Sequence, residues 1–181
     1  MQISERLWQA ESVCLTRIGD EDMNTVLAWY EDGEFMRLLD AATAYPKKPE
    51  DVRLWLRDSG NYVFGIRTRV DGRLIGYAEL NGILWNQGVA WLAIAIGEPG
   101  ERNQGYGQET VRLLLRYAFG ELNLRRVQLS VFSYNASAIQ VYEKCGFQRE
   151  GTYREFLFRD GEVHDMYLYG ILRREWEQAR V

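Results

Sequence analysis

The sequence is poor in the residues from which metal sites and disulfide frameworks are built. Its 181 residues include two cysteines, Cys14 and Cys145, and a single histidine, His164. The cysteines have no metal-like spacing, and one imidazole leaves little for a Ser-His-Asp or Cys-His catalytic device. We therefore expect reduced thiols, no bound metal and chemistry that does not run through histidine.

Long apolar runs are also missing. None approaches the roughly 20 residues that a bilayer-spanning helix needs. The N-terminus carries Glu5 and Arg6 where a signal peptide would be continuously apolar. We expect no membrane segment and no export, with the cytoplasm as the location.

Basic residues are not in excess. The formal net charge is -4 and the sequence pI is about 5.2, whereas a general nucleic-acid binder needs a large basic patch. The cluster of Arg112, Arg116, Arg125 and Arg126 is the only hint of a basic face, and solvated helix and loop positions explain it more simply. The sequence therefore predicts no nucleic-acid partner.

With three prolines, no repeat and no linker, the chain indicates one domain over residues 1–181. Period-two and β-branched patterns predict strands, and helical spacing and caps predict helices. Together they indicate an α/β (α+β) fold, with a mixed, mostly antiparallel central sheet and helices on both faces. The expected strands are 13–18, 62–70, 74–83, 89–96, 126–132, 150–158 and 163–172, and the expected helices begin near 20 or span 49–60, 108–122 and 136–144.

A glycine-containing loop lies between the strand at 89–96 and the helix expected from 108. It reads Arg102-Asn103-Gln104-Gly105-Tyr106-Gly107. Glycine allows a tight turn and a close approach to a ligand, and main-chain N–H groups at a helix N-terminus attract phosphate. The loop lacks the endings of the Walker and dinucleotide motifs. Taken alone, it fits a purely structural strand-to-helix turn equally well.

A second constellation follows the strand at 126–132. Asn135 is suited to cap the next helix and Gly146 to end it, and Asn135, Ala138 and Tyr142 share one side of that helix. An amide, a small residue and a phenol would then face one groove beside the glycine loop. The structural alternative makes Tyr142 a core aromatic with a hydrated hydroxyl.

At these residues the chain resembles the GNAT superfamily of acetyl-CoA-dependent N-acetyltransferases. The loop at 102–107 is similar to its Arg/Gln-x-x-Gly-x-Gly/Ala pyrophosphate motif, and the stretch 135–147 is similar to its other signature. The segments 5–7, 29–32, 45–46 and 151–172 are similar to the branch that includes ribosomal-protein N-terminal and polyamine acetyltransferases. The resemblance implies a GNAT-like acyl-CoA N-acyltransferase fold.

The resemblance also implies roles. Acetyl-CoA is the cosubstrate, with Tyr142 protonating the leaving thiolate and main-chain groups binding the pantetheine and pyrophosphate. No covalent enzyme intermediate is required. The implied cofactor-binding residues are Ile94, Ala95, Ile96, Arg102, Asn103, Gln104, Gly105, Tyr106, Gly107, Asn135, Ala138 and Tyr142.

The proton acceptor is less determined, because the strand at 89–96 carries no carboxylate where many relatives have the base. Glu79 on the preceding strand is the best side-chain candidate, although simple solvent contact, a water chain or an already neutral amine would explain the sequence as well. Cys145 is interpreted as a small apolar packing residue rather than a nucleophile.

The acceptor is expected to be a primary amine on a peptide N-terminus or a small metabolite. Aromatic side chains lining a site pack against the aliphatic part of a cationic amine, and carboxylates attract its ammonium group. As an alternative, Trp29 and Met36 are core residues. The sequence leaves open whether the protein forms a homodimer. The alternative function is that of a non-catalytic acyl-CoA sensor. The expected acceptor-site residues are Trp29, Tyr30, Glu34, Phe35, Met36 and Glu79.

Overall fold

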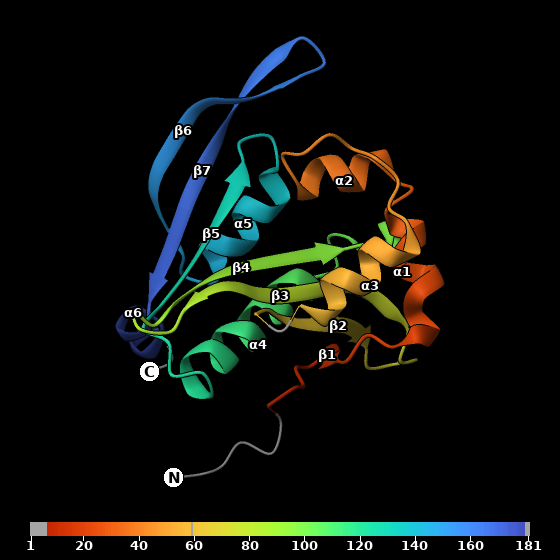
Figure 1. The fold of residues 1–181 in the computed structure, drawn as a ribbon. Coiled ribbons are helices and arrows are strands. Elements are labelled where there is room, and N and C mark those ends of the chain that lie inside the picture. The colour runs from red at the N-terminus through yellow and green to blue at the C-terminus, as the bar shows by residue number, and fades with distance from the viewer. Residues whose placement is uncertain (1–6, 59, 180–181) are drawn as a thin grey trace.

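Seven strands form one sheet in the order β1-β2-β3-β4-β5-β7-β6 (Figure 1). This computed structural model describes residues 7–58 and 60–179. Glu5 and Arg6, which belong to the segment 5–7 named in the family resemblance above, lie outside the described residues. Neighbouring strands are antiparallel except β4 and β5, which confirms the predicted mixed, mostly antiparallel sheet. The strands are β1 (Val13–Thr16), β2 (Tyr62–Thr68), β3 (Leu74–Leu84), β4 (Val89–Ile96), β5 (Arg126–Phe132), β6 (Gln148–Arg159) and β7 (Glu162–Leu172).

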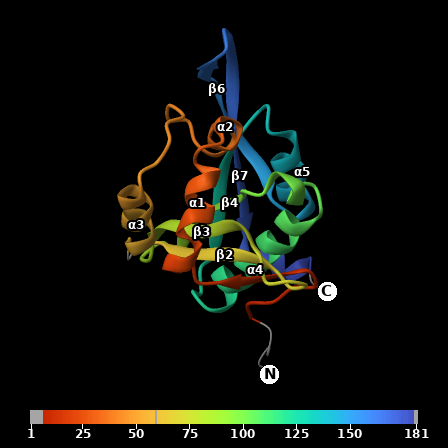
Figure 2. The same ribbon diagram turned by 90° about the vertical axis from the view of Figure 1, so that its right-hand side faces the viewer.

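Helices cover both faces of the sheet, as the sequence predicts (Figure 2). On one face α1 (Met23–Trp29), α2 (Gly33–Leu39) and α3 (Pro49–Arg57) pack on a cluster that includes Leu74, Tyr77 and Ala95. On the other face, α4 (Tyr106–Gly120) and α5 (Ala136–Lys144) enclose the larger core, which includes Leu114, Phe119 and Leu129. A short α6 (Arg173–Gln178) follows β7.

Three helical features depart from the sequence prediction. The first predicted helix begins as a 3-10 turn, η1 (Asp20–Asp22), before α1, and a second short 3-10 turn, η2 (Pro99–Glu101), precedes α4. The helices α2 and α6 were not predicted, because segments of seven and six residues carry too few turns for a periodic signal. The helix α4 begins at Tyr106, since Gly105 adopts a left-handed φ of 88° as its N-cap.

The parallel strands β4 and β5 separate along their length. They pair only where Val89–Trp91 runs beside Arg126–Gln128, while β4 continues beside β3 as far as Ile96. The Gly97 N–H donates to the Ile75 carbonyl on β3. Main-chain groups alternate between the two edges of a strand, so those of Ile94 and Ile96 point toward the opening on the β5 side.

The strands β6 and β7 form a hairpin that projects beyond the rest of the molecule (Figure 1). Its turn is the predicted Asp160-Gly161 pair, with φ of 53° and 84°. Two successive positive φ angles are the requirement of a type I′ turn. Within the part of the chain that the structure describes, no helix has the length and apolar character to span a membrane.

Candidate active site

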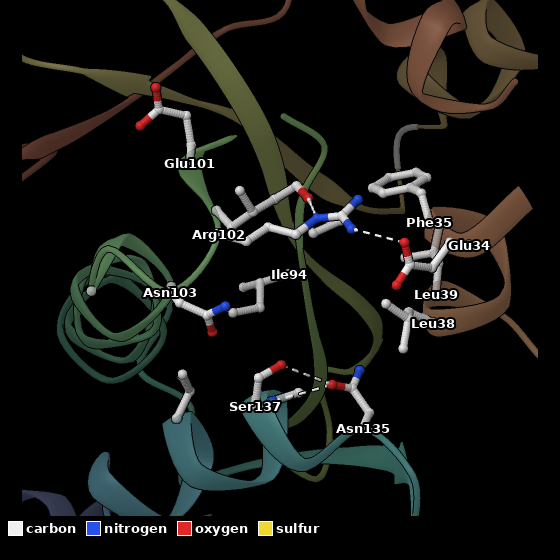
Figure 3. Close-up of a pocket in the computed structure, with 16 residues that line it drawn as sticks. Glu34, Phe35, Leu38, Leu39, Ile94, Glu101, Arg102, Asn103, Asn135 and Ser137 are labelled. Carbon is white, nitrogen blue, oxygen red and sulfur yellow. Dashed lines mark hydrogen bonds and ion pairs between the residues drawn. The ribbon is translucent and has the colours of Figure 1, made fainter. Parts of the chain in front are cut away.

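A cavity of about 320 Å³ opens where β4 separates from β5, and we call it the groove (Figure 3). Its floor comes from β4, one wall from α5 and the loop before α4, and the opposite wall from α2. The lining residues are Glu34, Phe35, Leu38, Leu39, Ile94, Ala95, Ile96, Glu101, Arg102, Asn103, Gly105, Gly107, Asn135, Ser137, Ala138 and Val141.

The loop before α4 presents unpaired N–H groups to the groove. Asn103 and Gly105 both have positive φ, 62° and 88°. The N–H groups of Gln108 and Glu109 donate back to the Gly105 carbonyl, whereas those of residues 103–107 have no acceptor in the described part of the chain. Five free donors at a helix N-terminus form a site for an anion such as phosphate.

The structure brings most, but not all, of the expected loop residues to the groove. Arg102, Asn103, Gly105 and Gly107 line it. Gln104 is exposed and does not line it, and Tyr106 packs against the core instead.

The Arg102 side chain bridges two walls of the groove (Figure 3). Its Nε donates to the Ile96 carbonyl at 3.3 Å, and its guanidinium lies 3.5 Å from Asp32 and 3.7 Å from Glu34. Asp32 is the N-cap of α2. Arg102 thus joins the N-terminal end of α2 to the open edge of β4. Glu34 and Phe35, which the sequence predicted for the acceptor site, line this groove.

The α5 wall is organised by Asn135. Its side-chain oxygen accepts hydrogen bonds from Ala138 N and Ser137 Oγ, both at 3.2 Å, which fixes the cap and leaves its amide N–H₂ free to donate into the groove. Ala138 and Val141 complete this wall. Val141, Ser137, Leu38 and Leu39 were not predicted, because small and aliphatic lining residues have no sequence signature distinct from core positions.

Tyr142 lies beside the groove without lining it. It follows Val141 by roughly 100° around the helix, and its ring packs edge-on against Phe147 at a centroid distance of 5.8 Å. Burial, and to a lesser degree the neighbouring Cys145, raises the pKa of the phenol well above its usual value of 10.0. The hydroxyl therefore stays protonated at physiological pH.

A second cavity, of about 340 Å³, lies between α3, β3 and the chain after α2, and we call it the acidic cavity. Of the charged residues that line it, Asp40, Asp51 and Glu79 are anionic and Lys47 is cationic. Leu39 lines both cavities, and β4 contributes Ala93 here and Ala95 to the groove. The other lining residues are Tyr30, Met36, Ala42, Thr43, Val52, Trp55 and Tyr77.

The side chains of the acidic cavity are held by hydrogen bonds. Glu79 accepts from Trp55 Nε1 at 2.9 Å and from Asn81 Nδ2 at 2.6 Å. The hydroxyls of Tyr30 and Tyr77 lie 3.1 Å apart. Burial raises the pKa of Tyr30 and, more strongly, that of Tyr77, so both phenols remain neutral beside the carboxylates.

Three of the expected acceptor-site residues, Tyr30, Met36 and Glu79, line the acidic cavity, but Trp29 does not. The Trp29 indole is buried against Gly97, where an added Cβ would lie 2.1 Å from the ring, and its Nε1 donates to Glu98 at 2.9 Å. Trp29 is thus a core residue, as the structural alternative supposed.

Several lining residues of the acidic cavity were missed. Asp51 and Trp55 are four residues apart on α3, and Tyr77 is two residues from Glu79 on β3. The same-face rules for helices and strands would have grouped each pair, but only the tertiary structure brings the two pairs together.

Cys145 behaves as a packing residue. Its Sγ donates weakly to the Gln108 carbonyl at 3.7 Å, and burial raises the pKa of the thiol to about 11 despite the opposing effect of Arg112. A thiol with that pKa is protonated at neutral pH and is a poor nucleophile. In the described residues, no group of three or more His, Cys, Asp or Glu side chains is arranged to hold a metal ion.

Comparison with known proteins agrees with this geometry. The family model described as an acetyltransferase (GNAT) domain matches residues 12–148. The chain belongs to the GNAT acetyltransferases. It is an acetyl-CoA-dependent N-acetyltransferase.

Individual relatives cover much of this chain. The uncharacterized N-acetyltransferase YokL of Bacillus subtilis is 29% identical over 173 residues, which is 94% of this chain and 95% of that protein. The spermidine N(1)-acetyltransferase of Vibrio cholerae is 33% identical over 103 residues, 57% and 59% of the two chains. A crystal structure of a Vibrio cholerae spermidine N-acetyltransferase with CoA and spermine matches with a TM-score of 0.81 and 24% identity, over 91% and 98% of the chains, and shows the same fold.

Proposed function

We propose that this acetyltransferase acetylates a compact, cationic primary amine that binds in the acidic cavity. The observation that carries the proposal is the charge of that cavity. Its lining holds three carboxylates, one lysine ammonium (Lys47) and several aromatic rings. Carboxylates in a partly enclosed site attract a cation, and the faces of Trp and Tyr rings add to that attraction. A neutral or acidic acceptor would gain nothing from this arrangement.

Acetyl-CoA is assigned to the groove. The free N–H groups at 103–107 match its pyrophosphate, and the open main-chain edge at Ile94 and Ile96 matches the amides of the pantetheine arm, which would add to β4 as a strand does. Asn135 has an amide donor left for the same arm. A relative of the same fold whose structure contains CoA supports this assignment.

The two cavities adjoin at Leu39, so an amine in one would face a thioester in the other. The amine nitrogen attacks the thioester carbonyl carbon, and the carbon–sulfur bond then breaks as the tetrahedral intermediate collapses. We assign Tyr142 as the acid that gives its proton to the departing thiolate, because it follows Val141 of the groove wall on α5 and its hydroxyl is protonated at physiological pH.

Glu79 is assigned as the acceptor of the amine's proton, directly or through one water. An alkylammonium has a pKa near 10.4 and must lose a proton before it attacks. The two hydrogen bonds to Glu79 fix the orientation of its carboxylate toward the cavity. Free N–H groups on the open edge of β4 are the donors available to the developing oxyanion.

The acceptor class includes polyamine-like and amino-sugar metabolites and the N-terminus of a peptide. A relative named a spermidine N(1)-acetyltransferase supports the small cationic amines within this class. The cavity volume of about 340 Å³ is at the small end of the usual ligand range, which also favours a small-molecule amine over a long peptide.

A thiol-release assay tests the proposal. The protein is incubated with acetyl-CoA and each member of a panel of polyamines, aminoglycosides, amino acids and short peptides, and free CoA thiol is measured. We expect the best substrates to be cationic beyond the reacting amine itself. A neutral or acidic compound as the best substrate of the panel would contradict the proposal.

A further inference from the structure

Arg159 lies at the end of β6, next to the hairpin turn, and its guanidinium contacts the end of α2. The Nη1 atom donates to the Arg37 carbonyl, and Nη2 donates to the carbonyls of Asp40 at 2.5 Å and Ala42 at 3.4 Å. The last carbonyls of a helix have no partner within the helix. One side chain from the projecting hairpin thus satisfies the C-terminal end of α2 and the first residues after it.

Tyr134 completes this contact. Its hydroxyl donates to the Arg37 carbonyl at 2.7 Å and accepts from Arg159 Nη1, also at 2.7 Å. The ring stacks on Phe132 and packs edge-on against His164. Tyr134 immediately precedes Asn135, which caps α5. The Tyr134 hydroxyl is therefore the point at which three parts of the molecule meet: the loop before α5, the hairpin and α2.

A second pair acts in the same direction at the surface. Arg37 of α2 forms a 2.7 Å ion pair with Asp160 of the hairpin turn. The Asp160 side chain is 75% exposed and that of Arg37 is 41% exposed, so solvent screens this pair and it contributes little by itself. Arg159 and Tyr134, which are half-buried, are the principal link between the hairpin and α2.

The two ends of α2 are held by different parts of the molecule. Its N-terminal end is fixed by the Asp32 cap, the Arg102 contact and the buried Phe35, all on the groove side. Its C-terminal end leads through Leu39 and Asp40 to Ala42, which line the acidic cavity. Leu38 and Leu39 at this end also line the groove, whereas Asp40 and Ala42 line only the acidic cavity. The residues that Arg159 contacts beyond the helix, Asp40 and Ala42, therefore belong to the acidic cavity alone.

We propose that Arg159, held by Tyr134, is a positioning residue that fixes the α2 wall of the acidic cavity and so sets which amines the enzyme accepts. It acts through Asp40 and Leu39 and touches neither the acetyl group nor the amine. The role of Arg159 in acceptor choice rests on the proposed function of the acidic cavity. The contact by which Arg159 holds α2 is independent of that proposed function.

The kinetic test replaces Arg159 by Ala, with Arg174→Ala as the matched control. Arg174 is an exposed arginine on α6, at the opposite end of the sheet from the hairpin turn (Figure 1). We expect Arg159→Ala to raise the acceptor KM by about tenfold while the acetyl-CoA Kd changes by less than about twofold. Arg159→Lys, which keeps the charge but loses the fork of donors, should recover only part of the effect.

A second measurement does not depend on knowing the acceptor. Hydrogen–deuterium exchange of the peptide spanning residues 33–42 reports whether α2 is held. We expect exchange there to accelerate by about tenfold in Arg159→Ala and to match the unsubstituted protein in Arg174→Ala. Tyr134→Phe removes one hydroxyl and keeps the ring, so we expect a smaller increase in exchange. This variant replaces Arg159→Ala in the experiment if Arg159→Ala does not fold.

The outcomes separate the two proposals. Unchanged exchange over 33–42 in both the Arg159 and Tyr134 variants would overturn the positioning role. Faster exchange with an unchanged acceptor KM would overturn the link between α2 and acceptor choice. If no cationic amine is turned over by the unsubstituted enzyme while exchange still accelerates in Arg159→Ala, the proposed function fails and the hold on α2 stands.

Discussion

The indole N–H of Trp55 donates a 2.9 Å hydrogen bond to the carboxylate of Glu79, and this contact ties α3 to β3 within the acidic cavity. Both residues line that cavity, and Glu79 also accepts a hydrogen bond from Asn81. The carboxylate is therefore held in one orientation by two neighbours. Its replacement tests the acidic cavity most directly.

Glu79→Gln keeps the size of the side chain and removes its charge. We expect the acceptor KM to rise and kcat to fall, for a combined loss in kcat/KM of about 10²-fold, while acetyl-CoA affinity is unchanged. Steady-state kinetics and calorimetry measure the two effects. Glu34→Gln is the control, because Glu34 lines the groove and pairs with Arg102. Equal effects of both substitutions on acceptor KM would argue against the assignment of the acidic cavity.

Tyr142→Phe removes one hydroxyl from a buried ring. If the phenol is the acid, kcat should fall by about 10²-fold with little change in CoA affinity. Because the ring and its contact with Phe147 remain, the thermal midpoint should stay near that of the unsubstituted protein. Turnover at the normal rate would exclude Tyr142 as the proton donor.

Alkaline pH should destabilise the fold through its buried phenols. Burial raises the pKa of Tyr30, Tyr77, Tyr142 and Tyr169, the last to about 12, above an unfolded value of 10.0. The folded chain keeps protons that the unfolded chain releases, so this stability is fully present below about pH 10 and is lost as the pH rises through the folded-state pKa values. The urea midpoint should fall as the pH rises from about 10 to about 11.5, with a shallower fall in Tyr142→Phe. A flat midpoint over that range would contradict the prediction.

Gly107→Val should weaken acetyl-CoA binding without unfolding the protein. A Cβ at this position would lie 3.5 Å from Ile94 Cδ1 and 3.8 Å from Val141 Cγ2, which are ordinary contacts. The further methyl groups of valine would enter the groove, and we expect the CoA Kd to rise by about tenfold or more, measured by calorimetry. Gly107→Ala should have a much smaller effect.

Gly105→Ala provides a contrasting control. There is open space around a Cβ at residue 105, but the φ of 88° is unfavourable for alanine. We expect a loss of stability of about 1 kcal/mol with a smaller change in CoA affinity than Gly107→Val causes. The reverse ranking of the two variants in CoA affinity would show that loop conformation, rather than space in the groove, governs binding.

The sequence predicted best those elements whose local signals agree. The bounds of β4, β5 and α5 match the prediction, because strand patterns and the Asn135 cap mark them independently of the rest of the molecule. The helix α2 could not be predicted in that way. Its seven residues are held by Phe35, Arg102 and Arg159, and two of these three are distant in sequence.

The groove was predicted more completely than the acidic cavity for a similar reason. A glycine loop and an N-cap are continuous motifs, so Gly105, Gly107 and Asn135 were found together. The wall of the acidic cavity combines α3, β3 and the chain after α2, and no single stretch of sequence carries it. Trp29 was misassigned because its position depends on Gly97, which is 68 residues away in the numbering.

The separation of β4 from β5 leaves the sheet with an unfilled position in its middle. On the proposed placement of acetyl-CoA, the pantetheine arm takes that position and bridges the two halves of the sheet, so the ligand acts as an additional structural element. A ligand that binds only the folded chain at 100 times its Kd stabilises it by about 2.7 kcal/mol. For a chain of this length, that corresponds to a rise of roughly 5–10 °C in Tm. The supply of acetyl-CoA would then govern the persistence of the folded enzyme as well as its rate, and starvation for the cosubstrate would expose it to proteolysis.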